Sequence, residues 1–174
     1  MKTLYGTLIG IVLVLMVAPL AVAGPRSFPS WDKQINNSGR FKVLDDFADA
    51  AVLDKETGLV WDQSPDTTTQ NWFSALVHCY QREVGGRKGW RLPTIEELAS
   101  LVDPNNPGGD PDLPPGHPFS NVQSSTYWSA TTVAISTSLA WHVIFIDGFV
   151  GNVGKSSAFH VWCVRGGQGI DGVQ

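Results

Sequence analysis

The chain has 174 residues, 18 glycines, seven tryptophans and a formal net charge of −4 at pH 7. One domain accounts for this length. An acidic chain has no general electrostatic attraction to nucleic acid, anionic lipid or a heparin-like polyanion. The composition therefore predicts no nucleic-acid partner and favours a loop-rich fold that is stiffened by aromatic side chains.

Residues 1–23 have the three parts of a secretory signal peptide. A basic start precedes an uncharged apolar run, and Ala21-Val22-Ala23 presents small residues to a peptidase. We expect cleavage before Gly24, which leaves a secreted chain without a membrane span. The alternative is an uncleaved anchor, because 4–23 is just long enough to cross a bilayer. Pro19 in that stretch favours cleavage.

Residues 24–40 are rich in Pro, Ser, Asn and Gly and show no apolar periodicity, which is typical of an extended arm or linker. The domain itself is expected over 41–174, although 41–49 has no clear period. Its first clear element is a hairpin over 51–61, where two short β-rich pieces flank a polar turn that ends in glycine. The stretch 62–69 is predicted to be a polar loop.

Two helices are expected next. Asn71 can cap a helix that runs through Gln81. Five of its apolar side chains fall at three- and four-residue spacings, so we expect them on one inward face: Trp72, Phe73, Leu76, Cys79 and Tyr80. The second helix begins at Thr94, which can form a capping box with Glu97. Its apolar positions are Ile95, Leu98, Leu101 and Val102.

Residues 103–125 form a long loop that is rich in proline and glycine, and loops of this length are usually functional or mobile. Asp103, Asp110 and Asp112, with Asn105 and Asn106, place oxygen ligands within it, which suits calcium. The loop lacks the EF-hand spacing, and its composition is equally typical of a solvated connector. Calcium is therefore an optional ligand, and no cofactor is required. The histidines have no zinc-ligand spacing: His78, His117, His142 and His160.

The last third of the chain is predicted to form strands. Residues 126–131 and 140–146 are β-rich, and Asp147-Gly148 predicts a tight turn before a strand that starts at Phe149. The segment 159–165 alternates, so its residues are expected on two faces. These faces are Phe159, Val161 and Cys163 on one side, and His160, Trp162 and Val164 on the other. The order of elements predicts an α+β fold.

The chain has two cysteines, Cys79 and Cys163. An even count in an oxidising compartment favours a disulfide, and the alternative is two buried free thiols. His78 precedes Cys79, as it would beside an activated thiol. Neighbours along a helix point in different directions, however, and a disulfide would remove the nucleophile. Because the chain also lacks a G-x-S-x-G motif, we expect no enzymatic activity.

Most tryptophans are expected in the core, where each indole N–H needs a partner. This group is Trp61, Trp72, Trp90, Trp128 and Trp162. An exposed tryptophan can stack on a sugar ring, and Trp141 is the best candidate for that role. We therefore place a ligand-binding set at Trp141, His142 and Asp147. Arg91 lies close to the predicted core and needs a carboxylate or several carbonyls, so we expect it to be a structural clamp.

Five short motifs follow one another between 52 and 167. They are Thr57-Gly58-Leu59-Val60-Trp61, Trp90-Arg91-Leu92-Pro93-Thr94, Tyr127-Trp128-Ser129-Ala130-Thr131, Ala140-Trp141 with Phe145-Ile146-Asp147-Gly148, and Cys163-Val164-Arg165-Gly166-Gly167. Any one of them is weak evidence. Five in order at sensible spacings resemble the Lcl C-terminal domain family, which is named for a bacterial collagen-like adhesin.

The resemblance implies a C-type-lectin-like fold, with two helices packed on short antiparallel sheets, a long loop and one disulfide. In that family a cysteine on the first helix pairs with one in the last strand, which implies the pair Cys79 and Cys163. Its members are usually secreted or surface proteins of bacteria, and the adhesin is associated with sulfated glycosaminoglycans. This chain is acidic and has no collagen-like repeat, so the resemblance does not settle its ligand.

The sequence thus favours a secreted, non-enzymatic binding or adhesion module that recognises a glycan or a surface protein. This hypothesis predicts an exposed aromatic or polar patch near the long loop and the last hairpin. The alternative is a structural or assembly module of the bacterial envelope or an extracellular appendage, which would form homo-oligomers through a large apolar patch. An enzyme related to the formylglycine-generating fold is a third hypothesis. Those enzymes are larger, and nothing here matches their active-site segment.

Overall fold

The computed structural model describes residues 37–103 and 110–166, and these residues belong to one unit, Trp31–Gln174. The predicted signal peptide at 1–23 lies outside the described residues. The described end of the predicted arm, α1 (Asn37–Arg40), is a helical turn. The Arg40 guanidinium is buried and donates to Asp54 Oδ1 and Oδ2 at 3.0 and 2.8 Å. The folded domain therefore includes Arg40, one residue before the boundary predicted at 41.

A four-stranded antiparallel sheet has the order β1-β2-β3-β9. Its strands are β1 (Phe41–Val43), β2 (Ala51–Asp54), β3 (Val60–Asp62) and β9 (Val164–Arg165). The predicted hairpin is confirmed as β2 and β3, and its turn closes at Gly58, which has a φ of 76° that favours glycine. The stretch 41–49, which had no clear period, contains β1 and the 3-10 turn η1 (Asp45–Phe47).

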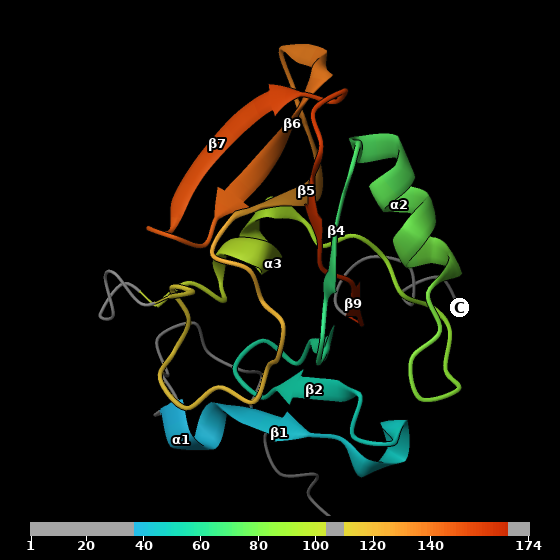
Figure 1. The fold of residues 1–174 in the computed structure, drawn as a ribbon, viewed down its shortest axis with the longest axis vertical. Coiled ribbons are helices and arrows are strands. Elements are labelled where there is room, and N and C mark those ends of the chain that lie inside the picture. The colour runs from blue at the N-terminus through green and yellow to red at the C-terminus, as the bar shows by residue number, and fades with distance from the viewer. Residues whose placement is uncertain (1–36, 104–109, 167–174) are drawn as a thin grey trace, which may run out of the picture. The chain divides into compact units, whose positions relative to one another are not determined.

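A five-stranded sheet has the order β4-β8-β5-β6-β7, in which only the β5 and β8 pair is parallel (Figure 1). Its strands are β4 (Asp66–Gln70), β5 (Thr126–Val133), β6 (Ser136–Ile144), β7 (Phe149–Gly154) and β8 (Phe159–Val161). The loop predicted over 62–69 is wrong, because β3 ends at Asp62 and β4 occupies the second half of the stretch. This strand is polar since it lies at the sheet edge, and threonine suits an extended backbone.

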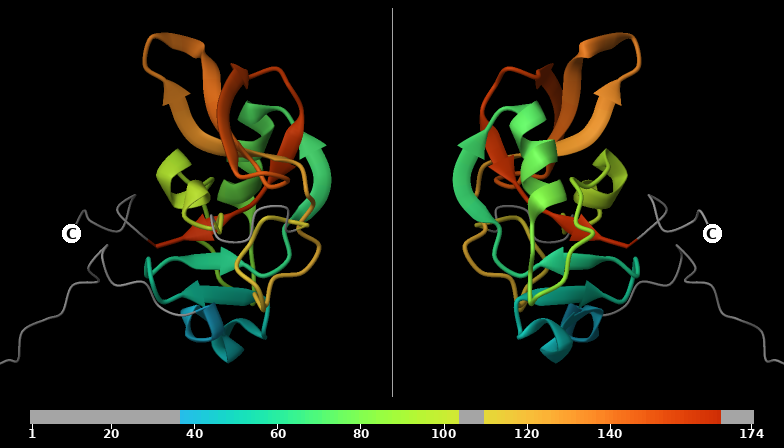
Figure 2. Two further views of the ribbon diagram at one scale, coloured as in Figure 1. Left: turned by 90° about the vertical axis from the view of Figure 1, so that its left-hand side faces the viewer. Right: turned by 90° about the vertical axis from the view of Figure 1, so that its right-hand side faces the viewer.

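Both predicted helices are present, as α2 (Trp72–Gln81) and the shorter α3 (Ile95–Ala99). The Asn71 side chain accepts a hydrogen bond from the Ser74 amide at 3.0 Å, and Thr94 and Glu97 form the predicted capping box. α2 packs on β5 and β8, whereas α3 packs on β5 and β6 (Figure 2). Within the described ranges, no helix is long and apolar enough to cross a membrane.

The interior contains two apolar clusters, which we call the α2 core and the α3 core. The α2 core consists of Phe47, Ala51, Trp72, Ala75, Cys79, Val84, Trp90, Leu92, Trp128, Ala140, Val161 and Cys163. The α3 core consists of Val52, Leu59, Trp61, Leu98, Leu101, Leu113, Phe119, Tyr127, Val143, Phe145, Trp162 and Val164. The two-faced alternation predicted for 159–165 is confirmed, because neighbouring residues of this segment enter different clusters.

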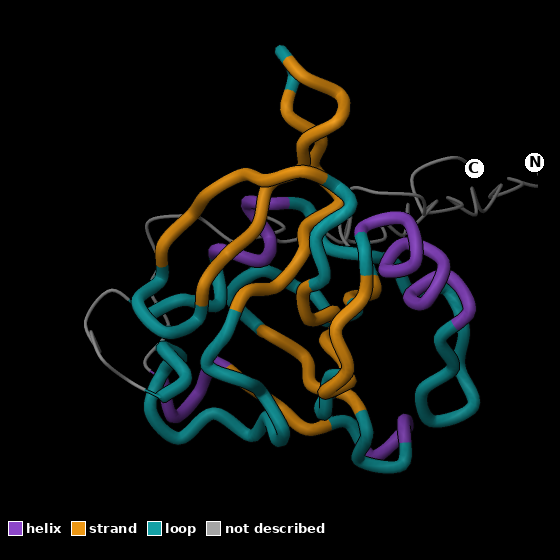
Figure 3. The backbone as a smooth tube through the Cα atoms, turned by 45° about the horizontal axis from the view of Figure 1, so that its top comes forward, coloured by secondary structure: helices purple, strands orange, loops and turns teal. Residues whose placement is uncertain are grey.

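The five tryptophans predicted to lie in the core are all buried. Four of their indole N–H groups donate to backbone carbonyls, namely those of Ser129, Arg87, Gln70 and Asp62. The Trp61 indole is buried without such a partner. The hairpin of β5 and β6 projects at its tip, 134–135 (Figure 3). Ile135 at this tip is 97% exposed.

Candidate functional site

The disulfide predicted between Cys79 and Cys163 is confirmed, with an S–S distance of 2.04 Å and a Cα–Cα distance of 5.4 Å. Both cysteines are buried. The bond joins the inner face of α2 to the segment between β8 and β9, where the chain passes from the five-stranded to the four-stranded sheet. It therefore fixes α2 to the part of the fold that connects the two sheets.

The first residue of α2 is held by three contacts. The Trp72 indole donates to the Ser129 carbonyl at 2.8 Å, and its backbone N–H donates to the Lys155 carbonyl at 3.1 Å. The Lys155 ammonium lies 3.8 Å from the centre of the Trp72 ring and donates to Thr132 Oγ1 at 2.8 Å. A cation over an indole face is a favourable arrangement. The start of α2 is thus fixed on β5 and on the turn after β7.

The residue after α2, Arg82, is paired with Asp62. Its guanidinium lies 2.6 Å from Asp62 Oδ2, and its backbone N–H donates to the Cys79 carbonyl. Burial raises the pKa of the Asp62 carboxyl, and the Arg82 charge opposes that effect. Both ends of α2 are consequently attached to the sheets, and the disulfide attaches its inner face between them.

The outer face of α2 carries an unexpected apolar row. Phe73 is 64% exposed, Val77 52% and Tyr80 81%, at the i, i+4 and i+7 positions of one helix face. The prediction that Phe73 and Tyr80 face inward is wrong. The inward positions are Trp72, Ala75 and Cys79, one step round the helix. The sequence could have indicated this exposed row, because it places apolar residues on two sides of the helix and only one side can face the core.

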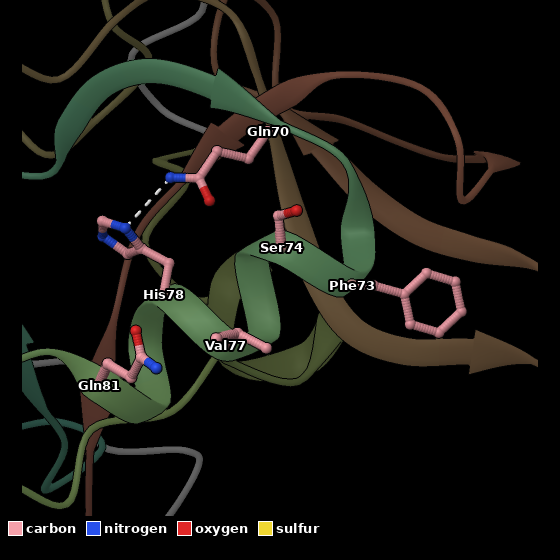
Figure 4. A pocket seen from close by; sticks show the side chains of 6 residues that line it. All are labelled: Gln70, Phe73, Ser74, Val77, His78 and Gln81. Carbon is pink, nitrogen blue, oxygen red and sulfur yellow. Dashed lines mark hydrogen bonds between the residues drawn. The ribbon is translucent and has the colours of Figure 1, made fainter.

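Grooves flank this apolar row. One, of about 430 Å³, lies between the end of β4 and α2. Figure 4 shows Ser74 and Val77 in its middle, Phe73 at one side, and Gln70 and His78 at the other. The Gln70 side-chain nitrogen lies 3.1 Å from His78 Nδ1, the one hydrogen bond among the residues drawn there. We call this hollow the Gln70–Gln81 groove, after the first and last residues that line it.

Two further grooves meet at Tyr80. One, of about 380 Å³, is lined by Leu76, Tyr80, Trp90, Arg91, Leu92, Thr94 and Ala130. The other, of about 410 Å³, is lined by Tyr80, Gln81, Lys88 and Gly89.

The clamp predicted at Arg91 is confirmed, because its guanidinium makes two 2.7 Å bonds to Glu97 and one of 2.6 Å to the Gly166 carbonyl. Arg91 thus contributes a fixed wall to the first of these two grooves.

The predicted ligand-binding set does not form one surface. Trp141 and His142 are neighbours on β6, so their side chains point to opposite faces of the sheet. Trp141 is half-buried, whereas His142 is buried against the rings of Trp128 and Phe159. Burial lowers the pKa of the His142 imidazole. Asp147 is exposed in the turn after β6 and accepts a hydrogen bond from the Phe149 amide at 3.1 Å.

Exposed apolar residues lie at the last hairpin, around the turn between β6 and β7, namely Ile146, Phe149 and Val150. Phe149 and Val150 are neighbours on β7, so their side chains point to opposite faces of the sheet. The long loop reaches this turn, since the Asp112 amide donates to the Phe145 carbonyl at 2.7 Å. The hairpin therefore carries the kind of exposed aromatic that the adhesion hypothesis predicts, on residues other than Trp141 and His142.

The predicted calcium ligands lie at two ends of the partly described loop, since 104–109, with Asn105 and Asn106, are outside the described residues. Asp103 and Asp112 are buried, and Asp110 pairs with Ser124. Burial and then the charges of Asp103 and Asp147 raise the pKa of the Asp112 carboxyl. In the ranges that the structure describes, no group of three or more His, Cys, Asp or Glu is arranged to hold a metal ion.

His78 and Cys79 point in different directions, as predicted. Cys79 is buried in the disulfide, and the half-exposed His78 lines the Gln70–Gln81 groove. Their side chains therefore serve separate parts of the molecule, the inner and the outer face of α2.

Comparison with known proteins identifies a matching family. The model of the Lcl C-terminal domain matches residues 50–165, which is more than half of the chain. The match includes both helices and both cysteines, and it ends at the last residue of β9. No curated protein matches the chain.

Proposed function

The chain belongs to the Lcl C-terminal domain family, and we propose that it is a secreted, non-enzymatic binding module with a C-type-lectin-like fold. It acts at or outside the cell surface and recognises a glycan or a surface protein through the outer face of α2. The family supports a surface or adhesion-related role, and the buried disulfide suits an oxidising compartment.

The observation that carries the proposal is the exposed row of Phe73, Val77 and Tyr80. Single exposed apolar residues are ordinary on protein surfaces. A row of three on one helix face, beside three grooves, is a contiguous patch of the kind that marks interaction sites. Because both ends and the inner face of α2 are anchored, this surface is already ordered before a ligand binds. Pre-organisation lowers the entropic cost of binding.

The proposal is tested by a glycan array probed with the secreted chain, with and without calcium. The triple variant F73S/V77S/Y80S should lose signal by about tenfold or more, because aromatic contacts dominate such surfaces. Ile135→Ser is the matched control, since Ile135 is more exposed than any of the three but lies on the projecting hairpin tip. It should bind as the wild type does.

Two outcomes would contradict this proposal. If the triple variant binds as strongly as the wild type, the outer face of α2 is not the binding surface. If the wild type binds no glycan with or without calcium, glycan recognition is wrong and an assembly role becomes the leading hypothesis.

The exposed hairpin residues Ile146 and Phe149 favour that second function, a structural module that assembles with other copies. Sedimentation of the secreted chain across a concentration series tests it. Assembly predicts a dimer or larger species that I146S/F149S returns to a monomer. A monomer at every concentration rejects self-assembly.

A further inference from the structure

The Gln70–Gln81 groove has a lining that differs in character from the rest of the α2 surface. Its polar groups come from Gln70 at the end of β4 and from one row of α2, Ser74, His78 and Gln81, at the i, i+4 and i+7 positions. Phe73 and Val77 supply its apolar surface (Figure 4). The groove therefore places a row of hydrogen-bonding groups beside a row of carbon surface.

None of the residues that line this groove is Asp, Glu, Lys or Arg. The next basic residue along the chain, Arg82, is engaged by Asp62. By contrast, the groove lined by Tyr80, Gln81, Lys88 and Gly89 contains Lys88, whose side chain is 76% exposed and lies 3.7 Å from the Glu83 carboxylate. An anionic ligand would be attracted to Lys88, whereas no residue that lines the Gln70–Gln81 groove carries a fixed charge. The Lys155 ammonium lies 5.9 Å from the Phe73 ring, but it is engaged by the Trp72 ring and Thr132 Oγ1.

From this lining we infer that the Gln70–Gln81 groove binds a neutral, hydroxyl-rich glycan without calcium. Amide, hydroxyl and imidazole groups can each donate or accept hydrogen bonds, which is what a series of sugar hydroxyls requires. The Phe73 ring and the Val77 methyl groups supply apolar contact for the C–H face of a sugar ring. The inference rests on the proposed function, because it names the ligand class of the same helix face.

The groove is partly organised in advance of binding. The Gln70 amide and the His78 ring are already joined at 3.1 Å, which orients both side chains. The Gln70 carbonyl accepts the Trp128 indole N–H at 2.9 Å, so the backbone at this position is tied to β5. A ligand that bonds to these groups therefore orders few side chains on binding.

The test is an NMR titration of the secreted chain in calcium-free buffer. The neutral probes are chitotetraose and cellotetraose, and the anionic probe is a heparin-derived tetrasaccharide. A neutral probe should shift the backbone amides of 70–81 and the His78 ring signals. Q70A/H78A should weaken this binding about tenfold or more, because two hydrogen-bonding side chains are removed.

Thr69→Ala is the matched control, because Thr69 precedes Gln70 on β4, is exposed and does not line the groove. It should leave the affinity unchanged. Gln81→Ala is a second test at an exposed helix position, where folding is not at risk, and should weaken binding about threefold to fivefold.

The failures of this inference and of the proposed function are distinguishable. Binding of only the anionic probe, with shifts around Lys88, overturns the neutral-glycan inference and leaves the α2 surface as the binding site. Shifts with a neutral probe at 146–150 instead of 70–81 overturn the inference and the site. Binding of no probe overturns the inference, and the array then decides whether any glycan is a ligand.

Discussion

The two helices of the domain use their apolar residues differently. α3 begins with a capping box, and its apolar side chains are buried or half-buried in the α3 core. α2 is twice as long, with ten residues against five, and buries only one of its two apolar faces. The other face leaves Phe73, Val77 and Tyr80 in solvent.

This difference separates what α2 needs for folding from what it presents to solvent. The attachments of α2 come from its inner face and its ends, through Trp72, the disulfide and Arg82. The exposed row adds less to them. The Phe73 ring meets the Trp72 ring edge-on at 5.2 Å, but exposed side chains remove little apolar surface from water on folding. Apolar residues that fold stability does not require are the ones a ligand can use.

Removing the disulfide should have the largest effect on stability. Cys79 and Cys163 are 84 positions apart, and closing a loop of that size stabilises a fold by about 4 to 5 kcal/mol as an upper estimate. C79A/C163A should lose most of that amount in urea unfolding, and reduction of the wild type should lower its Tm sharply. Free thiols in the oxidised secreted chain, or an unchanged Tm after reduction, would refute the structural role of the bond.

Leu98→Ala should cause the second largest loss in the free energy of unfolding. Leu98 of α3 is fully buried in the α3 core, and truncation of such a leucine costs about 2 to 5 kcal/mol. The urea midpoint of this variant should fall while the m-value stays constant. A loss below about 1 kcal/mol would mean that α3 is not the buried helix of the pair.

Acid should lower the free energy of unfolding by a smaller amount, through histidines that lie in neither helix. Burial lowers the pKa of His117, His142 and His160 below the usual value of 6.5. The unfolded chain therefore takes up protons first as the pH falls through about 6.5, so the stability present above that pH is progressively lost. Urea unfolding should give a lower free energy of unfolding at pH 5 than at pH 7. A free energy that is constant or higher at pH 5 would contradict this assignment.

At lower pH the buried carboxyls raise the free energy of unfolding, which is the opposite of the histidine effect. Burial raises the pKa of Asp62 and Asp112 above the usual 3.8. The folded state therefore takes up these protons first, and stability is gained as the pH falls through the folded-state pKa. Asp112→Asn should consequently leave the pH 5 to 7 loss in place, which separates the histidine effect from the carboxyl effect.

Much of the fold could be predicted because its signals are local. The capping groups at Asn71 and Thr94, the hairpin turn and the alternation of 159–165 each depend on neighbours in the chain. The strand β4 was not predictable in this way. Its polar residues are extended because β8 provides the pairing partner, and that partner lies about 90 residues away in the chain.

The candidate site was harder to predict for the same reason. The sequence shows apolar residues on two sides of α2, and a rotation of one residue, about 100°, decides which side is buried. That choice is made by the sheets and the disulfide, not by the helix. The Gln70–Gln81 groove depends on where β4 ends beside α2, which local patterns do not specify. At the last hairpin the sequence predicted an exposed aromatic or polar patch, and the exposed apolar residues there are Ile146, Phe149 and Val150.

The smallest expected change is also the most direct test of the central claim, that the outer face of α2 is available for a ligand and not required for folding. The measurement is the free energy of urea unfolding of F73S/V77S/Y80S against the wild type. Serine matches the helix propensity of the residues it replaces, so only lost contacts contribute. We predict a change below about 1.5 kcal/mol in total, three surface substitutions of at most about 0.5 kcal/mol each. A loss as large as that of Leu98→Ala would contradict the claim and make this face part of the folded core.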